Sequence, residues 1–159
     1  MAFLLCSKLK ALSFEPGCSV ASIKESTFKG CTSLEGVDFR HAASLADIGV
    51  SSFADCKALS KVEFGASLRS VQSSAFSGCE ALSSVRLPSS LASIGDGAFA
   101  GCSSLSEIAF CGAEVEEFRR CSVRRRFRSL GLFGRDVLRD SDSGEPRLRL
   151  QLPERSVHG

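Results

Sequence analysis

The sequence lacks several residues and patterns that binding sites and active sites commonly need. Its 159 residues include no Trp, no Tyr and only two histidines, His41 and His158. It has no Cys-x-x-Cys pair, which with so little histidine argues against a metal site. It has no phosphate-binding glycine loop, no Gly-x-Ser-x-Gly turn, and no nucleophile, base and acid at motif spacing. We therefore expect neither an enzyme nor a bound cofactor or small-molecule substrate.

Long apolar runs are also missing. None reaches the roughly 18 to 20 residues that a membrane-spanning helix needs. The opening "MAFLLC" is apolar, but Lys8 and Lys10 interrupt it too early for a secretory signal. The default expectation is a cytoplasmic protein. A surface or secreted location stays open if the chain is a fragment of a longer protein.

What the sequence has in quantity is phenylalanine, with 12 residues, and a repeated motif that uses it. The pattern Phe-x-x-Cys-x-x-Leu occurs five times, beginning at Phe3, Phe28, Phe53, Phe76 and Phe99. The steps between these anchor residues are 25, 25, 23 and 23 residues. A fixed period of this length is the signature of a solenoid, in which stacked repeats share one core.

Further apolar positions repeat in register with the anchors. Nine residues after each anchor stand Leu12, Val37, Val62, Val85 and Ile108. Eleven residues after stand Phe14, Phe39, Phe64, Leu87 and Phe110, and five residues before the last four anchors stand Ile23, Ile48, Val71 and Ile94. Apolar residues two apart predict a short strand with one buried face. We therefore expect two short strands in each repeat, one at the positions nine and eleven residues after the anchor and one around the position five residues before it, joined by turns.

The stretch "LPSSLASIGDGAFAGCSSLSEI" from Leu87 to Ile108 resembles the BspA-type leucine-rich repeat. The resemblance covers five repeats over residues 3–110 and rests on the block I-G-x-x-A-F-x-x-C-x-x-L. It implies a right-handed leucine-rich-repeat solenoid of about five coils, mainly β or α/β, with parallel β-ladders and short helical turns. Gly95 and Gly97 allow positive φ in a tight turn, and we expect "AFAGC" to form a helical turn ending at Gly101. Members of the family are best known as surface or secreted binding proteins.

The repeated cysteines invite a chemical role, but the register favours packing. We predict a core ladder formed by Cys6, Cys31, Cys56, Cys79 and Cys102 with Phe28, Phe53, Phe76 and Phe99. Coils about 4.8 Å apart would permit a disulfide by distance, yet five in-register thiols cannot all pair. Free cysteine behaves as a small buried hydrophobe. Cys18 and Cys111 lie off the ladder, so we expect them to be more exposed and to react first with thiol reagents.

The residues between the apolar positions on the predicted strands form the candidate partner-binding face. These are Lys10, Glu35, Asp38, Lys61, Glu63, Ser84, Arg86 and Glu107. The face is rich in small residues, mixed in charge and free of aromatics. Arg86 is its one residue of a type favoured at interface hot spots. A merely solvated strand face is the alternative reading.

The composition changes after the last repeat. Residues 1–118 hold nine Lys and Arg against 13 Asp and Glu, whereas residues 119–159 hold 11 Arg, no Lys and five acids. We therefore divide the chain into a solenoid at 1–112, a basic capping helix or degenerate repeat at 113–139, and a disordered tail at 140–159. Val123, Phe127, Leu130 and Val137 stand at helical spacing, although "RLRLQL" in the tail alternates as a strand would.

Three hypotheses of function follow. The first is a non-catalytic module that binds another protein through the strand face. The second is association with an anionic membrane or nucleic acid through Arg119, Arg120, Arg124, Arg125, Arg126 and Arg128. The third is a fragment of a longer repeat-containing surface or adhesion protein without an independent function.

Overall fold

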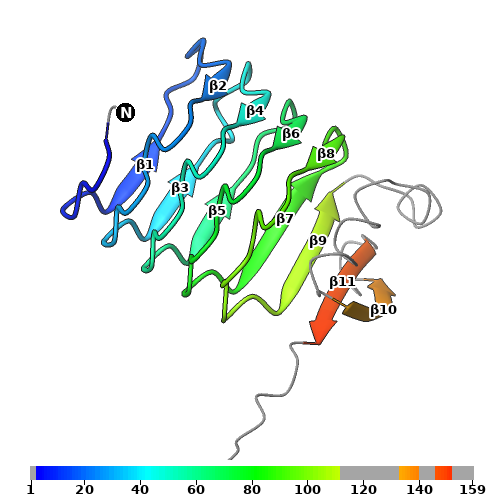
Figure 1. The fold of residues 1–159 in the computed structure, drawn as a ribbon. Coiled ribbons are helices and arrows are strands. Elements are labelled where there is room, and N and C mark those ends of the chain that lie inside the picture. The colour runs from blue at the N-terminus through cyan, green and yellow to red at the C-terminus, as the bar shows by residue number, and fades with distance from the viewer. Residues whose placement is uncertain (1–2, 112–132, 140–145, 152–159) are drawn as a thin grey trace, which may run out of the picture.

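The computed structural model describes residues 3–111, 133–139 and 146–151, with side-chain surroundings for residues 3–109. Successive coils of the chain lie side by side in a row, with one set of strands low in the view and a set of shorter strands above it (Figure 1). The predicted solenoid with parallel β-ladders is therefore confirmed.

Two sheets run along the solenoid. The first, which we call sheet A, takes one strand from each of the five repeats: β1 (Ala11–Ser13), β3 (Gly36–Asp38), β5 (Lys61–Glu63), β7 (Ser84–Pro88) and β9 (Glu107–Cys111). The second, sheet B, contains β2 (Ser22–Ile23), β4 (Asp47–Ile48), β6 (Ser70–Val71) and β8 (Ser93–Ile94). All neighbouring strands of these two sets are parallel.

Residues that occupy equivalent positions in the sequence repeats are also paired with one another in the sheets. Leu12 pairs with Val37, and Val37 pairs with Val62, so equivalent positions of successive repeats lie side by side. On strands β3, β5 and β7 the valine (Val37, Val62 and Val85) is buried in the solenoid, while the residues on either side of it are half-buried or exposed. One face of sheet A is thereby buried and the other is left for contacts outside the solenoid.

Phenylalanine rings fill the core in two stacks. The anchor rings stack at centroid distances of 5.2, 5.1, 5.2 and 5.6 Å from Phe3 through Phe99, with interplanar angles of 14° or less. A second stack joins Phe14, Phe39 and Phe64, and Phe39 meets Phe53 edge-on at 5.9 Å. Such pairs contribute about 0.5–1.5 kcal/mol beyond area burial. A single repeat would leave both faces of its rings in water.

The expected helical turns are not found among the described residues, which form hydrogen-bonded turns there instead. Every second N–H group of the turn bonds within its own coil, as Cys31 does to the carbonyl of Phe28. The N–H groups between these donate to the next coil, as Phe28 does to Ser52 and Gly30 to Ala54. An α-helix needs all of these donors for itself. Half of them are committed to the neighbouring coil, so a helix cannot propagate.

Left-handed backbone recurs at two positions of this turn. Two residues before the anchor, Ser26, Ser51, Ser74 and Gly97 all have φ between 51° and 63°. Two residues after it, Leu5, Gly30, Asp55, Gly78 and Gly101 have φ between 59° and 73°. Of the two glycines expected to allow positive φ in this turn, Gly97 adopts it and Gly95 does not. A Cβ atom at Gly95 would lie 2.3 Å from the backbone nitrogen of Ser73, so close approach between coils requires glycine there.

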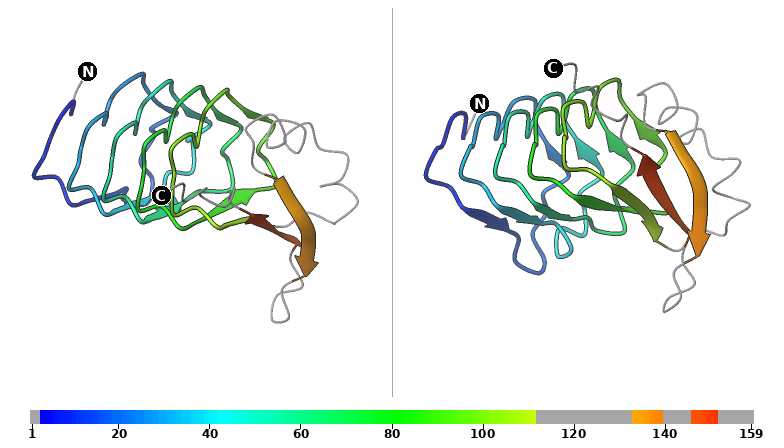
Figure 2. Two further views of the ribbon diagram at one scale, coloured as in Figure 1. Left: turned by 60° about the horizontal axis from the view of Figure 1, so that its bottom comes forward. Right: turned by 90° about the horizontal axis from the view of Figure 1, so that it is seen from below.

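Two further strands extend sheet A beyond the last repeat. Strand β11 (Pro146–Gln151) pairs antiparallel with β9, and β10 (Phe133–Arg139) pairs antiparallel with β11 (Figures 1 and 2). Residues 133–139 are thus a strand and not part of a helix, and residues 146–151 are a strand and not part of a disordered tail. The reason is the free edge of β9, whose backbone groups need partners and find them in β11. The remainder of both predicted segments lies outside the described residues.

Candidate functional site

The face of sheet A that points away from the core, here called the outer face, is the candidate site. Of the residues predicted to form it, Asp38, Lys61, Glu63, Ser84, Arg86 and Glu107 lie on strands β3, β5, β7 and β9. Lys10 and Glu35 are exposed but lie directly before β1 and β3, outside the strands. The strand register places Asp38 next to Glu63, and Glu63 next to Arg86. Six of the eight predicted residues therefore share one surface.

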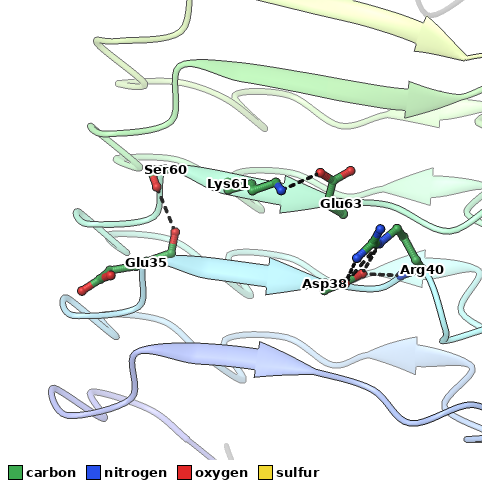
Figure 3. A network of polar contacts seen from close by, with 6 residues as sticks. All are labelled: Glu35, Asp38, Arg40, Ser60, Lys61 and Glu63. Carbon is green, nitrogen blue, oxygen red and sulfur yellow. Dashed lines mark hydrogen bonds and ion pairs between the residues drawn. The ribbon is translucent and has the colours of Figure 1, made fainter.

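The Asp38 carboxylate is held by Arg40, two residues later on the same side of the chain (Figure 3). Arg40 Nη2 donates to Asp38 Oδ2 at 2.6 Å, and Arg40 Nε donates to the two carboxylate oxygens at 3.0 and 3.1 Å. The Arg40 backbone N–H donates to Oδ1 at 2.9 Å. These hydrogen bonds from Arg40 favour the ionised carboxylate and lower the pKa of Asp38 to about 2.

Glu63 has its own partner on the same strand (Figure 3). Lys61 Nζ lies 3.2 Å from Glu63 Oε1. Nearby, the Ser60 hydroxyl donates to the Glu35 carbonyl at 3.1 Å and ties two coils together. Exposed ion pairs of this kind contribute roughly 0–1 kcal/mol each. Their larger effect is to neutralise neighbouring charge on the outer face.

Arg86 differs from these charged neighbours. Its side chain is exposed and makes no hydrogen bond or ion pair that the structure shows for residues 3–109. Arg40, in contrast, is committed to Asp38, and Lys61 to Glu63. Arg86 is therefore the basic residue on the outer-face strands whose hydrogen-bond donors remain available to a partner.

Arg40 was missed by the sequence analysis. It follows strand β3 and was outside the positions considered to face outward. The available signal was a basic residue two positions after an acidic one at a strand end, since residues two apart project to the same side of an extended chain. The ion pair with Arg40 offsets the negative charge of Asp38 on this part of the outer face.

The cysteine ladder lies inside the solenoid, away from the outer face. Cys31, Cys56, Cys79 and Cys102 are buried, and each thiol donates to the carbonyl of the anchor Phe in the preceding coil at 3.1–3.2 Å. Burial raises the pKa of Cys56 and of Cys102 to about 12, and it raises the pKa of Cys31 and Cys79 as well. Since the thiolate is the reactive form, these groups serve packing and coil-to-coil hydrogen bonding.

The remaining cysteines depart from this arrangement. Cys6 is only half-buried, because the described residues place no coil beyond the first one. Cys18, expected to be exposed, is half-buried and packs against the core. Cys111, the other cysteine predicted to lie off the ladder, is the last residue of β9.

The other predicted basic contacts, Arg119, Arg120, Arg124, Arg125, Arg126 and Arg128, lie outside the described residues. Within the part of the chain that is described, no three His, Cys, Asp or Glu residues cluster as metal ligands would. The same part contains no helix long and apolar enough to cross a membrane.

Repeating coils, a shared core and a continuous parallel sheet with one free face define a leucine-rich-repeat solenoid. A family model described as "BspA type Leucine rich repeat region" matches residues 1–124 with six copies, and the chain belongs to this family. The comparison with curated proteins found no match.

Two solved structures share the fold. A leucine-rich repeat protein from Bacteroides capillosus is 24% identical with a TM-score of 0.57, covering 64% of this chain and 77% of its own. The pneumococcal vaccine antigen PcpA is 24% identical with a TM-score of 0.55, covering 67% of this chain and 29% of its own. At this level of identity the likeness shows the fold alone.

Proposed function

We propose that the protein is a non-catalytic interaction module that binds another protein through the outer face of sheet A. The observation that supports this most is the combination of a regular parallel sheet and an exposed arginine, Arg86, on its outer side. The strands hold outward positions in fixed register about 4.8 Å apart, so the face is rigid before a partner arrives. Rigid surfaces lose little conformational entropy on binding.

A site-specific cross-linker tests this proposal. Benzoylphenylalanine replaces Ser84, which is exposed on β7 of sheet A, or Ser93, which is exposed on β8 of sheet B. Both are exposed serines, and they lie on consecutive strands of the chain but in different sheets, so they form a matched pair. We expect a discrete covalent adduct with a partner protein from position 84 and none from position 93. Equal adducts from both positions would contradict the proposal.

A second candidate function is association of the basic segment with an anionic membrane or nucleic acid. The asymmetry of charge favours it, with a net charge of +6 over residues 119–159 against −4 over residues 1–118. Both candidates can hold together, since they use different parts of the chain.

Deleting residues 119–159 would be a poor test, because β10 and β11 on the edge of sheet A would also be lost. Glutamine in place of Arg119, Arg120, Arg124, Arg125, Arg126 and Arg128 keeps both strands. We expect this variant to lose binding to vesicles containing phosphatidylserine or to a single-stranded RNA, while cross-linking from position 84 persists. Unchanged vesicle and RNA binding would remove the second candidate.

A further inference from the structure

The pairing of β11 with β9 brings basic residues from the end of the chain to the outer face. In this register Leu148 pairs with Ile108, which is fully buried on the core side of sheet A. Paired residues of antiparallel strands belong to the same face, and successive residues alternate between faces. Arg147 and Arg149 are therefore outer-face positions, about 60 residues after Arg86 in the sequence.

Two rows of paired residues cross the strands at this end of the outer face. One row, here called the arginine row, runs from β5 to β10 through Glu63, Arg86, Ala109, Arg147 and Leu138. The neighbouring row runs from β7 to β10 through Ser84, Glu107, Arg149 and Asp136. The rows differ in how their charges are compensated.

In the neighbouring row, Arg149 is paired with Glu107 on one side and with Asp136 on the other. This arginine therefore has acidic residues on both sides. In the arginine row, Arg147 is paired with Ala109 and Leu138, neither of which carries charge. Arg86 is paired with Ala109 and with Glu63, and the Glu63 carboxylate already lies 3.2 Å from Lys61 Nζ. Arg86 and Arg147 are therefore the two basic positions of the arginine row, one on each side of Ala109 in the strand register.

Ala109 lies on β9, between Arg86 on β7 and Arg147 on β11. Two strand spacings therefore separate the backbones of the two arginines, which is about 10 Å. Ala109 is paired with the exposed Arg86 and therefore belongs to the outer face. Its methyl group offers no hydrogen bond that would compete for a guanidinium group. Two arginines on either side of a small apolar residue form a site for a single carboxylate, because each guanidinium donates two parallel hydrogen bonds.

We propose that Arg86 and Arg147 together bind a carboxylate of an acidic, extended segment of the partner protein. This inference rests on the proposed function and assigns the chemistry of that partner. The segment lies across the outer face, and one Glu or Asp side chain of it reaches the position above Ala109. The partner thereby supplies a negative charge between the two arginines, where the row itself has Ala109.

A model peptide tests this in the full-length chain. The probe is a fluorescein-labelled hexapeptide of alternating glycine and glutamate, and its control has glutamine at each glutamate. Fluorescence anisotropy gives the dissociation constant for each. We expect the glutamate peptide to bind measurably tighter than the glutamine peptide. Equal affinity for the two peptides would overturn the proposal.

Three variants locate the site. Arg86→Gln and Arg147→Gln should each weaken binding of the glutamate peptide about tenfold, which is typical of losing a charge-assisted hydrogen bond. Arg69→Gln is the matched control, since Arg69 is exposed just before β6 of sheet B, and it should change affinity less than twofold. An equal loss in Arg69→Gln would mean that only net charge matters and would refute the site.

The double variant tests whether the arginines share one carboxylate. If they do, Arg86→Gln combined with Arg147→Gln weakens binding by less than the product of the two single effects. Independent, multiplicative effects would show two separate contacts and contradict the shared site. RNA or phosphatidylserine vesicles are measured in the same way. If either binds more tightly than the glutamate peptide, and if Arg86→Gln and Arg147→Gln abolish that binding, the occupant is not an acidic protein segment.

The two proposals fail separately. A discrete adduct from position 84 that forms equally well in Arg86→Gln and Arg147→Gln would sustain the interaction face and refute the carboxylate site. Adducts that form equally from positions 84 and 93 would refute the interaction face itself. Peptide binding that depends on both arginines would still stand in that case as a property of this surface.

Discussion

Ser52 is the residue whose environment fits its chemistry least well. Its side chain is fully buried, and its hydroxyl finds no hydrogen-bond partner in the described structure. The same slot holds Ala75 and Ala98 in later coils. A buried hydroxyl without a partner costs about 1–3 kcal/mol. We therefore expect Ser52→Ala to raise the free energy of unfolding by about 1 kcal/mol in urea denaturation.

Thr27 provides the control for this substitution, since it occupies the same slot in an earlier coil. Its hydroxyl donates to the Lys24 carbonyl at 2.7 Å. Thr27→Ala removes that hydrogen bond and should lower stability by about 0.5–1.5 kcal/mol. Changes of the same sign in both variants would show that the unsatisfied hydroxyl of Ser52 is not the cause.

Thiol reactivity should follow burial along the cysteine ladder. With pKa values raised to about 12, Cys56 and Cys102 hold almost no thiolate at pH 8. We expect iodoacetamide to leave both unmodified in the native protein and to modify them in urea, as read by site-resolved mass spectrometry. Cys6, half-buried on the first coil, should be modified without denaturant. Native labelling of Cys56 as fast as Cys6 would contradict a packed ladder.

The Asp38–Arg40 pair should leave a trace in the pH dependence of stability. The folded pKa of Asp38, about 2, lies below the ordinary value of about 3.9, so the ionised form is favoured in the folded state. Its contribution is therefore fully present above about pH 4 and is lost as the pH falls towards 2. Carboxyl-carbon NMR should give a midpoint near 2 in the wild type and one closer to 3.9 in Arg40→Gln. Identical midpoints would show that Arg40 does not hold the carboxylate.

At the scale of the element, the turn imposes left-handed backbone whichever residue occupies it. Ser74 and Gly97 fill the same slot with φ of 55° and 63°. A Cβ atom at Gly97 would meet atoms no closer than 3.6 Å, so Gly97→Ala changes the backbone preference without a steric clash. We expect Gly97→Ala to lower the free energy of unfolding by about 1–2 kcal/mol, and Ser74→Gly to raise it by up to about 1 kcal/mol. A neutral result in both would mean that the slot carries no strain.

The elements also show what the sequence can and cannot predict. Register between repeats followed from the spacing of residues such as Leu12 and Val37, because neighbouring coils impose the same local pattern. The turn was misjudged as helical, because its N–H groups bond alternately to the next coil and this is invisible in one repeat. Strand β11 was missed as a partner of β9 because their pairing joins distant segments outside the repeat. The outer face was thus predicted in part, without Arg40 or Arg147.

For the whole molecule, stability should depend on position along the solenoid. In a repeat protein it is approximately the sum of the repeats and of the interfaces between neighbours. Phe53 is fully buried and stacks on rings at 5.1 and 5.2 Å on its two sides. Phe3 is 47% exposed and stacks on Phe28 alone. The same substitution at these two anchors therefore removes two interfaces in one case and one partial interface in the other.

Phe53→Ala should accordingly lower the free energy of unfolding by about 3–5 kcal/mol, and Phe3→Ala by about 1 kcal/mol. Hydrogen exchange resolves where the effect travels. We expect Phe3→Ala to speed exchange only in the first coil and where the second coil packs on it, because Phe3 stacks on Phe28. Phe53→Ala should speed exchange on both sides of the third coil, in β3 and β7 alike. A uniform increase over all coils in both variants would mean that the solenoid unfolds as one unit, without the nearest-neighbour coupling that its stacked rings suggest.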